Sequence, residues 1–321
     1  MTLSKKKFCS FGLMWWRTSI SVTTSNLFLG QSEYLETFLY FTLGLIDDIK
    51  NLNPFTKLFF QIGIGTLVYV SGPQFNGIDL SWINQNLDPI LLPKILSYTI
   101  TLLLIVGITN AINWLDGLDG LASGISTITS IGLFIIFIGL NKTELILIMA
   151  ILAGSTLGFI RYNFYPAKIL MGDGGSYLLG STLAILSIYG LSNNDMKSII
   201  TYNNNDTLYI LPLHIIVLLF IVPIIDMTQV IITRIINGKS PFRPDRSHLH
   251  HKLLYKGLTQ RDTVIILYAI SQVGVSISLY LSDVPGKLIY LCLSAIFAIL
   301  SILYCINMKK QLDNKYKKQN I

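Results

Sequence analysis

Long apolar segments recur along most of this 321-residue chain, and they limit its fold more than any other feature. A helix needs about 20 apolar residues to cross a bilayer, because each residue rises only about 1.5 Å. Eight segments meet this need, at about 57–73, 95–112, 122–140, 145–161, 176–191, 208–233, 263–282 and 286–307. A ninth, at 33–46, is shorter and carries Glu36. Since only 13% of the residues are charged, the sequence predicts an all-α, polytopic membrane bundle of eight or nine helices and excludes a soluble globular protein.

No polar linker is long enough to divide these segments into separate domains. We expect one membrane-embedded domain over 33–307, followed by a basic tail at 308–321. Residues 1–32 match no span, and we expect an atypical N-terminal segment that is truncated or misassigned, or that has diverged.

Lysine and arginine are distributed unevenly between the two faces that alternate threading of these spans would create. Sixteen lie on one face, in or beside the loops at 47–56, 113–121, 162–175 and 234–262 and in the tail, against four on the other. Basic residues concentrate on the cytoplasmic side of membrane proteins. The net charge of +7 therefore indicates orientation and contact with membrane lipid, and we expect no nucleic-acid partner.

The unusual polar clusters all lie in the loops assigned to the cytoplasmic face. The first is the pair Asp47-Asp48, which ends an apolar segment. Adjacent helical residues point about 100° apart, so one carboxylate can face a site while the other binds a basic or backbone partner. A charged helix end at the membrane surface is the alternative.

The second cluster lies between residues 110 and 120. Spacings of three residues place Asn110, Asn113, Asp116 and Asp119 along one stripe if this segment stays helical. Carboxylate and amide oxygens on one face suit a cation such as Mg²⁺. The spacing of a calcium loop is absent.

The third cluster surrounds Asp173. Glycines and Pro166 prevent a continuous helix before it, which places Asp173 on an irregular turn at the start of a span. The N-terminal amides of that span could hold an anion. A plain Asp-Gly-Gly turn is the alternative.

The fourth cluster is cationic. Three of the chain's four histidines lie within four residues beside two arginines, and the set is Arg243, Arg246, His248, His250 and His251. Such side chains favour contact with a diphosphate, with an ordinary basic loop as the alternative. Asp226, an acid inside an apolar segment, is either functional or paired with Arg234 or the backbone. Metal ligands, cations and a membrane surface together suit phosphoryl transfer.

These four clusters, with the spans between them, resemble the signature loops of the polyprenyl-phosphate N-acetylhexosamine-1-phosphate transferases, glycosyltransferase family 4. The resemblance rests on Asp47-Asp48, the runs 110–121 and 163–176, and His-Leu-His-His at 248–251, and it covers about residues 38–307. Members are bacterial membrane enzymes that load a sugar phosphate from a UDP-sugar onto undecaprenyl phosphate. They usually have two further spans before the Asp-Asp pair, which residues 1–46 do not match.

The resemblance implies a phosphotransferase of the bacterial cytoplasmic (inner) membrane, with its active-site loops in the cytoplasm. The His-x-His-His form resembles the branch that transfers N-acetylglucosamine 1-phosphate from UDP-GlcNAc to undecaprenyl phosphate, releasing UMP and initiating a cell-surface glycan. The alternatives are the phospho-MurNAc-pentapeptide transferases or another UDP-N-acetylhexosamine branch. A membrane transporter is the alternative from a different class, but its polar residues would lie deep within the spans.

The resemblance also implies roles for individual residues. Asn113 and Asp173 would hold Mg²⁺, or Mn²⁺ as the alternative. Asp47 and Asp48 would be catalytic and assist the lipid phosphate. The other candidates would bind the UDP-sugar, and they are Asn110, Asp116, Asp119, Arg243, Arg246, His248, His250 and His251. A homodimer through lipid-facing helices is a further expectation.

Overall fold

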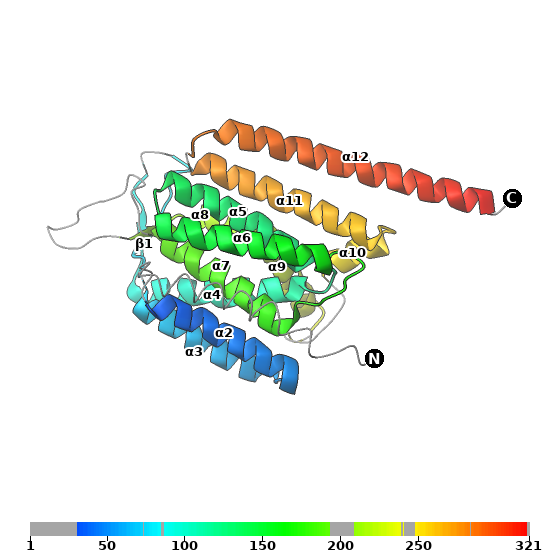
Figure 1. Ribbon diagram of the computed structural model, residues 1–321. Coiled ribbons are helices and arrows are strands. Elements are labelled where there is room, and N and C mark those ends of the chain that lie inside the picture. Colours follow the sequence, from blue (N-terminus) through cyan, green and yellow to red (C-terminus); the bar gives the residue numbers. More distant parts are fainter. Residues whose placement is uncertain are drawn as a thin grey trace.

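The structure is a computed structural model, and it describes residues 31–72, 74–84, 87–192, 209–238, 240, 248–282 and 284–319. These residues form a bundle of helices with one very small sheet (Figure 1). The helices are α2 (Gln31–Lys50), α3 (Pro54–Ser71), α4 (Lys94–Leu115), α5 (Leu121–Gly139), α6 (Thr143–Asn163), α7 (Gly172–Ser192), α8 (Leu213–Leu219), α9 (Ile221–Ile236), α10 (Leu249–Tyr255), α11 (Gln260–Leu281) and α12 (Lys287–Gln319). The strands are β1 (Gly77–Ile78), β2 (Ile90–Leu91) and β3 (Ile210–Leu211).

The apolar helices confirm the predicted all-α, polytopic membrane architecture. Within the described residues, six helices are long and apolar enough to cross a membrane, or seven if the bent pair α8 and α9 forms one span. The six are α4, α5, α6, α7, α11 and the Lys287–Tyr304 part of α12. Helices α2 and α3 replace the expected spans at 33–46 and 57–73; they pack in the same bundle but do not reach this level of apolarity.

Helix α7 forms the centre of the bundle. Within its apolar window 94% of the residues are buried, and it packs against α2, α4 and α5. Two glycines permit this close packing. A Cβ atom on Gly180 would lie 2.7 Å from Cα of Thr109 in α4, and one on Gly44 in α2 would lie 2.4 Å from the carbonyl oxygen of Asp173. Small residues at helix contacts allow such approach of backbones in membranes.

The expected span at 208–233 is not a single continuous helix. The chain there forms strand β3, then α8 and α9, which meet at an angle of 85°. Pro223 explains the break, because its ring has no N–H for the carbonyl of Leu219 and clashes with a continuing helix. The Thr129 hydroxyl of α5 donates to that carbonyl at 3.2 Å, so the interrupted backbone stays satisfied inside the bundle.

The two ends of the bundle differ. The sheet lies at one end and α10 at the other (Figure 1). In the sheet, β1 pairs antiparallel with β2 and parallel with β3, in the order β2-β1-β3. Helix α12 packs on α11 at the edge of the bundle and continues to Gln319, so the described part of the basic tail is helical.

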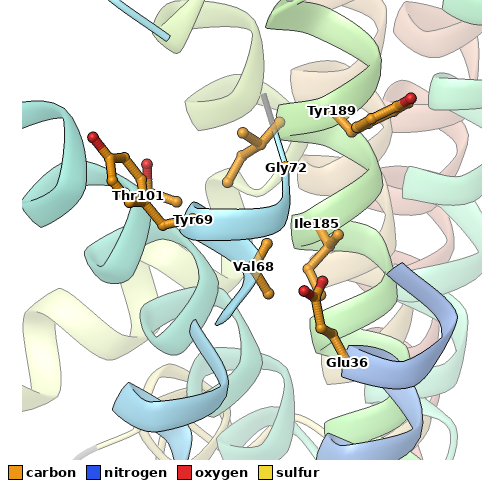
Figure 2. Close-up of a pocket in the computed structure, with 8 residues that line it drawn as sticks. Glu36, Val68, Tyr69, Gly72, Thr101, Ile185 and Tyr189 are labelled. Atoms are coloured by element: carbon orange, nitrogen blue, oxygen red, sulfur yellow. The ribbon is translucent and has the colours of Figure 1, made fainter. Parts of the chain in front are cut away.

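A narrow pocket lies among α2, α3, α4 and α7, toward the sheet end (Figure 2). Glu36, Val68 and Ile185 line it, and the hydroxyl of Ser71 donates to the Glu36 carboxylate at 2.5 Å. None of the site residues expected from the sequence lines this pocket. The candidate site lies instead at the opposite ends of the same helices.

Candidate active site

The turn between α2 and α3 places a lysine against the Asp47 carboxylate. Asn51 adopts a positive φ of 49°, and the side chain of Asn53 accepts a hydrogen bond from Phe55 N at the start of α3. This tight turn returns the chain so that Lys57 forms an ion pair with Asp47. The Lys57 ammonium also lies 3.8 Å from the Asp173 carboxylate. The buried Asp47 carboxylate therefore faces the same position as Asp173.

Asp48 has a different partner. Its two carboxylate oxygens accept hydrogen bonds from the backbone N–H groups of Asp173, at 2.9 Å, and Gly174, at 3.0 Å. These are amides of the first turn of α7, where a negative charge is stabilised by the helix dipole. The expected anion site at this helix start is thus occupied by the chain's own Asp48. Helix α7 also begins at Gly172, so Asp173 lies in its first turn rather than on an irregular turn before it.

Asn113 connects α4 to this cluster. Its side-chain nitrogen donates to the Asp173 carboxylate at 2.8 Å and to the Ser176 hydroxyl at 2.9 Å. The two residues expected to hold the metal ion are therefore in direct contact. Asn110, one turn earlier, exchanges hydrogen bonds with the side chain of Gln61 in α3, at 2.7 and 3.3 Å. This amide pair connects α3 and α4 next to the site.

The expected helical stripe from Asn110 to Asp119 is only half formed, because α4 ends at Leu115. Asp116 caps the helix and Asp119 lies in the following loop, where its carboxylate accepts from Ala167 N at 3.0 Å. Burial, together with the negative charges of Asp173, Asp48 and Asp119, raises the pKa of Asp116 to about 8. Asp116 therefore faces the carboxylate cluster, while Asp119 connects two loops.

The carboxylates at this end fit a divalent cation. Four carboxylates, those of Asp47, Asp48, Asp116 and Asp173, gather there around Lys57. Mg²⁺ usually takes one or two protein oxygen ligands and completes its coordination with water and substrate phosphates. Asp173, in contact with Asn113, can supply such ligands, and the hard oxygen donors favour Mg²⁺ or Mn²⁺ over softer metals.

The histidines lie on α10, beside the loop after α4. The His250 and His251 rings are 4.5 Å apart, and the His248 and His250 rings are stacked at 5.3 Å. A Cβ atom on Gly117 would lie 3.0 Å from Nε2 of His250, so the histidine contacts the loop that carries Asp116. Burial lowers the pKa of His250 to about 4, so its ring is neutral at neutral pH. Arg243 and Arg246 lie outside the described residues.

Lys57 has no assigned role in the sequence-based expectations, and those expectations leave the partner of Asp226 open. Lys57 is near the carboxylates only because α3 folds back onto α2, and its sequence signal is a lone lysine at the start of an apolar segment. Asp226 pairs with His248, at 2.7 Å, and it accepts a hydrogen bond from the backbone N–H of Leu249, which is the backbone pairing allowed for in the sequence. A buried acid in an apolar segment is a recognisable signal, but the partner lies 22 residues later along the chain.

The fold and site together define a multi-pass membrane protein with a carboxylate and histidine cluster at one end of its bundle. Comparison with known proteins identifies the family. The model of glycosyl transferase family 4 matches residues 32–191. The chain belongs to this family, and it is therefore a sugar-phosphate transferase of the class predicted from the sequence.

Three relatives show how far the likeness extends. A probable undecaprenyl-phosphate N-acetylglucosaminyl 1-phosphate transferase of Bacillus subtilis is 35% identical over 84% of this chain and 70% of its own length. A decaprenyl-phosphate N-acetylglucosaminephosphotransferase of Mycobacterium leprae is 36% identical over 70% of this chain, which spans only 58% of that relative. A phospho-N-acetylmuramoyl-pentapeptide-transferase of Staphylococcus aureus is 28% identical over 82% of this chain and 81% of its own length.

Proposed function

We propose that this protein transfers N-acetylglucosamine 1-phosphate from UDP-GlcNAc to undecaprenyl phosphate and releases UMP. One observation carries the proposal: Asp47, Lys57, Asn113 and Asp173, from four different helices, converge at one end of a membrane bundle. Phosphoryl transfer relies on positioning and charge stabilisation more than on covalent chemistry, and this cluster supplies both. The names of the relatives from Bacillus subtilis and Mycobacterium leprae support N-acetylglucosamine as the sugar.

Asn113 and Asp173 are the proposed ligands of Mg²⁺, with Mn²⁺ as the alternative. When bound, the ion neutralises charge on the diphosphate of the UDP-sugar. Asp48 is proposed to hold Asp173 in position, because its carboxylate accepts hydrogen bonds from the amides of Asp173 and Gly174 and so fixes the first turn of α7.

Asp47 and Lys57 are proposed to act on the lipid phosphate. Lys57 is positioned to attract the anionic phosphate, while Asp47 fixes the ammonium and can accept a remaining proton. An oxygen of the lipid phosphate then attacks the phosphorus that carries the sugar. A new P–O bond forms, the bond to the bridging oxygen breaks, and UMP leaves with the electron pair. No covalent aspartyl intermediate is required.

The UDP-sugar is proposed to lie between the loop after α4 and the start of α10. Asp116 and Asp119 position the nucleotide sugar, and Asn110 supports α4 beside them. His248, His250 and His251, with Arg243 and Arg246, contact the diphosphate or the sugar. His250 does so as a neutral hydrogen-bonding group, because its low pKa removes its charge at neutral pH.

The proposed orientation places this end of the bundle in the cytoplasm, where UDP-sugars are available, within the bacterial inner membrane. The product would initiate a cell-surface glycan. Sixteen basic residues on this face against four on the other support the orientation. A homodimer through lipid-facing helices stays a prediction.

Purified protein mixed with undecaprenyl phosphate, MgCl₂ and UDP-GlcNAc tests the proposal. We expect UMP to appear together with a lipid product whose mass corresponds to undecaprenyl diphosphate bearing one N-acetylglucosamine. Chelation by EDTA should abolish the reaction, and Mg²⁺ or Mn²⁺ should restore it. Asp79→Asn, a substitution at the sheet end, should leave the rate unchanged, whereas Asp173→Asn should abolish it.

Three outcomes would contradict parts of the proposal. UMP release with UDP-MurNAc-pentapeptide, but not with UDP-GlcNAc, would assign the pentapeptide branch, which the Staphylococcus aureus relative represents. Release only with another UDP-N-acetylhexosamine would change the sugar. A sugar phosphate trapped covalently on an aspartate would overturn direct attack.

A further inference from the structure

Asp226 of α9 makes two contacts that the proposed mechanism leaves unused. Its carboxylate is 1% exposed, and one oxygen lies 2.7 Å from Nδ1 of His248. The other oxygen accepts a hydrogen bond from the backbone N–H of Leu249, the first residue of α10, at 2.6 Å. One buried carboxylate therefore determines both the ring position of His248 and the start of α10.

The same helix also contacts the end of α4. The guanidinium of Arg234 lies 5.2 Å from the ring centre of Trp114, and the His248 ring meets Trp114 edge-on at 5.8 Å. Trp114 follows Asn113, which contacts Asp173. A continuous set of contacts thus connects Asp226 through His248 and Trp114 to the carboxylate cluster.

We propose that Asp226 is a positioning residue of this site, which fixes the ring of His248 in the tautomer with its proton on Nδ1 and holds α10 against the loop after α4. The inference rests on the proposed function, because it assigns His248 a defined role toward the UDP-sugar. Asp226 itself lies behind the histidine and acts through it.

The chemistry of the pair sets the tautomer. An ionised carboxylate only accepts hydrogen bonds, so the Nδ1 atom of His248 must carry the proton. The Nε2 atom is then the ring nitrogen left to face the diphosphate or the sugar. Asn has nearly the same shape, but its NH₂ group can donate to Nδ1 while its oxygen accepts from Leu249. Asp226→Asn therefore keeps the packing and favours the opposite tautomer, with the proton on Nε2.

Nitrogen-15 NMR of the full chain, labelled only at histidine, reads the tautomer directly and needs no activity. The chain has four histidines, and a His248→Gln variant assigns the His248 signals. We expect a protonated Nδ1 in the wild type and a protonated Nε2 in Asp226→Asn. A wild-type His248 protonated on Nε2 alone would overturn the inference, even if no variant folds.

Kinetics test whether the tautomer matters. We expect Asp226→Asn to lower kcat/KM for UDP-GlcNAc about 100-fold, the scale of a small misplacement of a reacting group, and to leave the KM for undecaprenyl phosphate unchanged. In a His248→Ala background the same substitution should have no further effect, since the carboxylate acts through the ring. Asp79→Asn is the matched control, because Asp79 also accepts from a backbone N–H and a side chain, at the opposite end.

The remaining results separate the possibilities. Two results would reduce Asp226 to a structural role. In the first, the losses of kcat/KM from Asp226→Asn and His248→Ala add up in the double variant. In the second, unfolding, measured as a fall in Tm, accounts for the whole loss of kcat/KM in Asp226→Asn. Asp226, His248 and His250 have potential metal-binding atoms within 4.8 Å of one another. Stoichiometric metal in the purified protein that is lost in Asp226→Asn would therefore make the group a metal site and overturn the inference. If wild-type protein releases no UMP, the proposed function fails, while the NMR result still decides the tautomer.

Discussion

At the scale of single residues, the site concentrates negative charge around one lysine. Among the residues that the structure describes, Lys57 reaches both Asp47 and Asp173, and Asp48 accepts hydrogen bonds separately from the amides of α7. Each carboxylate thus has a different environment although two of them are adjacent in sequence. The chemistry of each depends on its partners more than on its residue type.

Lys57 should be essential for the proposed reaction. We expect Lys57→Gln to lower kcat by about 100-fold or more, because it removes a fixed positive charge where the lipid phosphate is proposed to bind. Lys50→Gln is the matched control, since Lys50 is exposed at the end of α2, and its rate should stay within about twofold of the wild type. UMP release in the same detergent or vesicle system measures both. Equal losses in the two variants would show that the effect is general charge near the membrane.

Asp116 should make stability depend on pH. Its folded pKa of about 8 lies above the value of about 4 expected in an unfolded chain, so the folded state binds this proton more tightly. Stability without metal should therefore fall as the pH rises from about 4 to 8, and the fall should stop above that range. Asp116→Asn should weaken this dependence.

Tm measured from pH 5 to 9 in EDTA, for the wild type and Asp116→Asn, checks this expectation. Added Mg²⁺ should raise the wild-type Tm most at the high end of this range, where the carboxylate is ionised. A wild-type Tm that rises steadily across this range would contradict the raised pKa.

At the scale of elements, the site depends on how closely α2 and α7 approach. Gly44 is the contact point, because a Cβ atom there would lie 2.4 Å from the backbone oxygen of Asp173. The hydrogen bonds from the first turn of α7 to Asp48 exist only at this short separation. Gly174 of α7 also packs closely there, because a Cβ atom on it would lie 3.3 Å from the side chain of Leu45 in α2.

Gly44→Ala should separate these two helices. We expect a loss of about 1–3 kcal/mol in stability. We also expect a marked loss of activity, because separating the helices displaces both Asp48 and Asp173. Gly63→Ala in α3 is the control, since a Cβ atom there meets nothing within 4 Å and Ala favours the helix. Tm and UMP release measured on both variants decide the matter, and a Gly44→Ala protein with normal activity would show that the site tolerates helix movement.

At the scale of the whole molecule, α10 and the sheet lie at opposite ends of the bundle (Figure 1). The carboxylate cluster and His250 lie at the α10 end. The face on which basic residues concentrate is therefore also the face that carries the site. The two were located independently, the first from lysines and arginines and the second from acids and histidines. A transporter would instead have its polar residues near the middle of the spans. The family assignment supports the transferase reading.

The orientation can be tested by labelling single cysteines in cells, in a background without Cys9, Cys292 and Cys305. We expect Lys50→Cys, at the site end, to react with a membrane-impermeant maleimide only after the membrane is permeabilised. Ile90→Cys, which is exposed in the sheet, should react in intact cells. The reverse pattern would place the site outside and contradict a reaction that uses cytoplasmic UDP-sugar.

The amino-acid sequence by itself was enough to predict the membrane class, the family and the polar clusters around Asp47, Asn113, Asp173 and the histidines, although the first three lie on helices and not in loops. Apolarity and short motifs are local properties, so they can be read without knowing which segments touch. The number of spans could not be predicted in the same way. A count from apolar length ignores where a proline interrupts the backbone, as it does near Phe220, and it overestimates α2 and α3, which are less apolar than the other helices.

Only the tertiary structure decided which polar groups are partners. Asp48 meets the amide of Asp173 across 125 positions of the chain, Asn113 meets Asp173 across 60, and Asp226 meets His248 across 22. Such contacts depend on helix packing, which the hydrophobic pattern permits in many registers. The same packing buries Asp116 and His250 and shifts their pKa values, so their protonation states follow from the fold and not from the motifs.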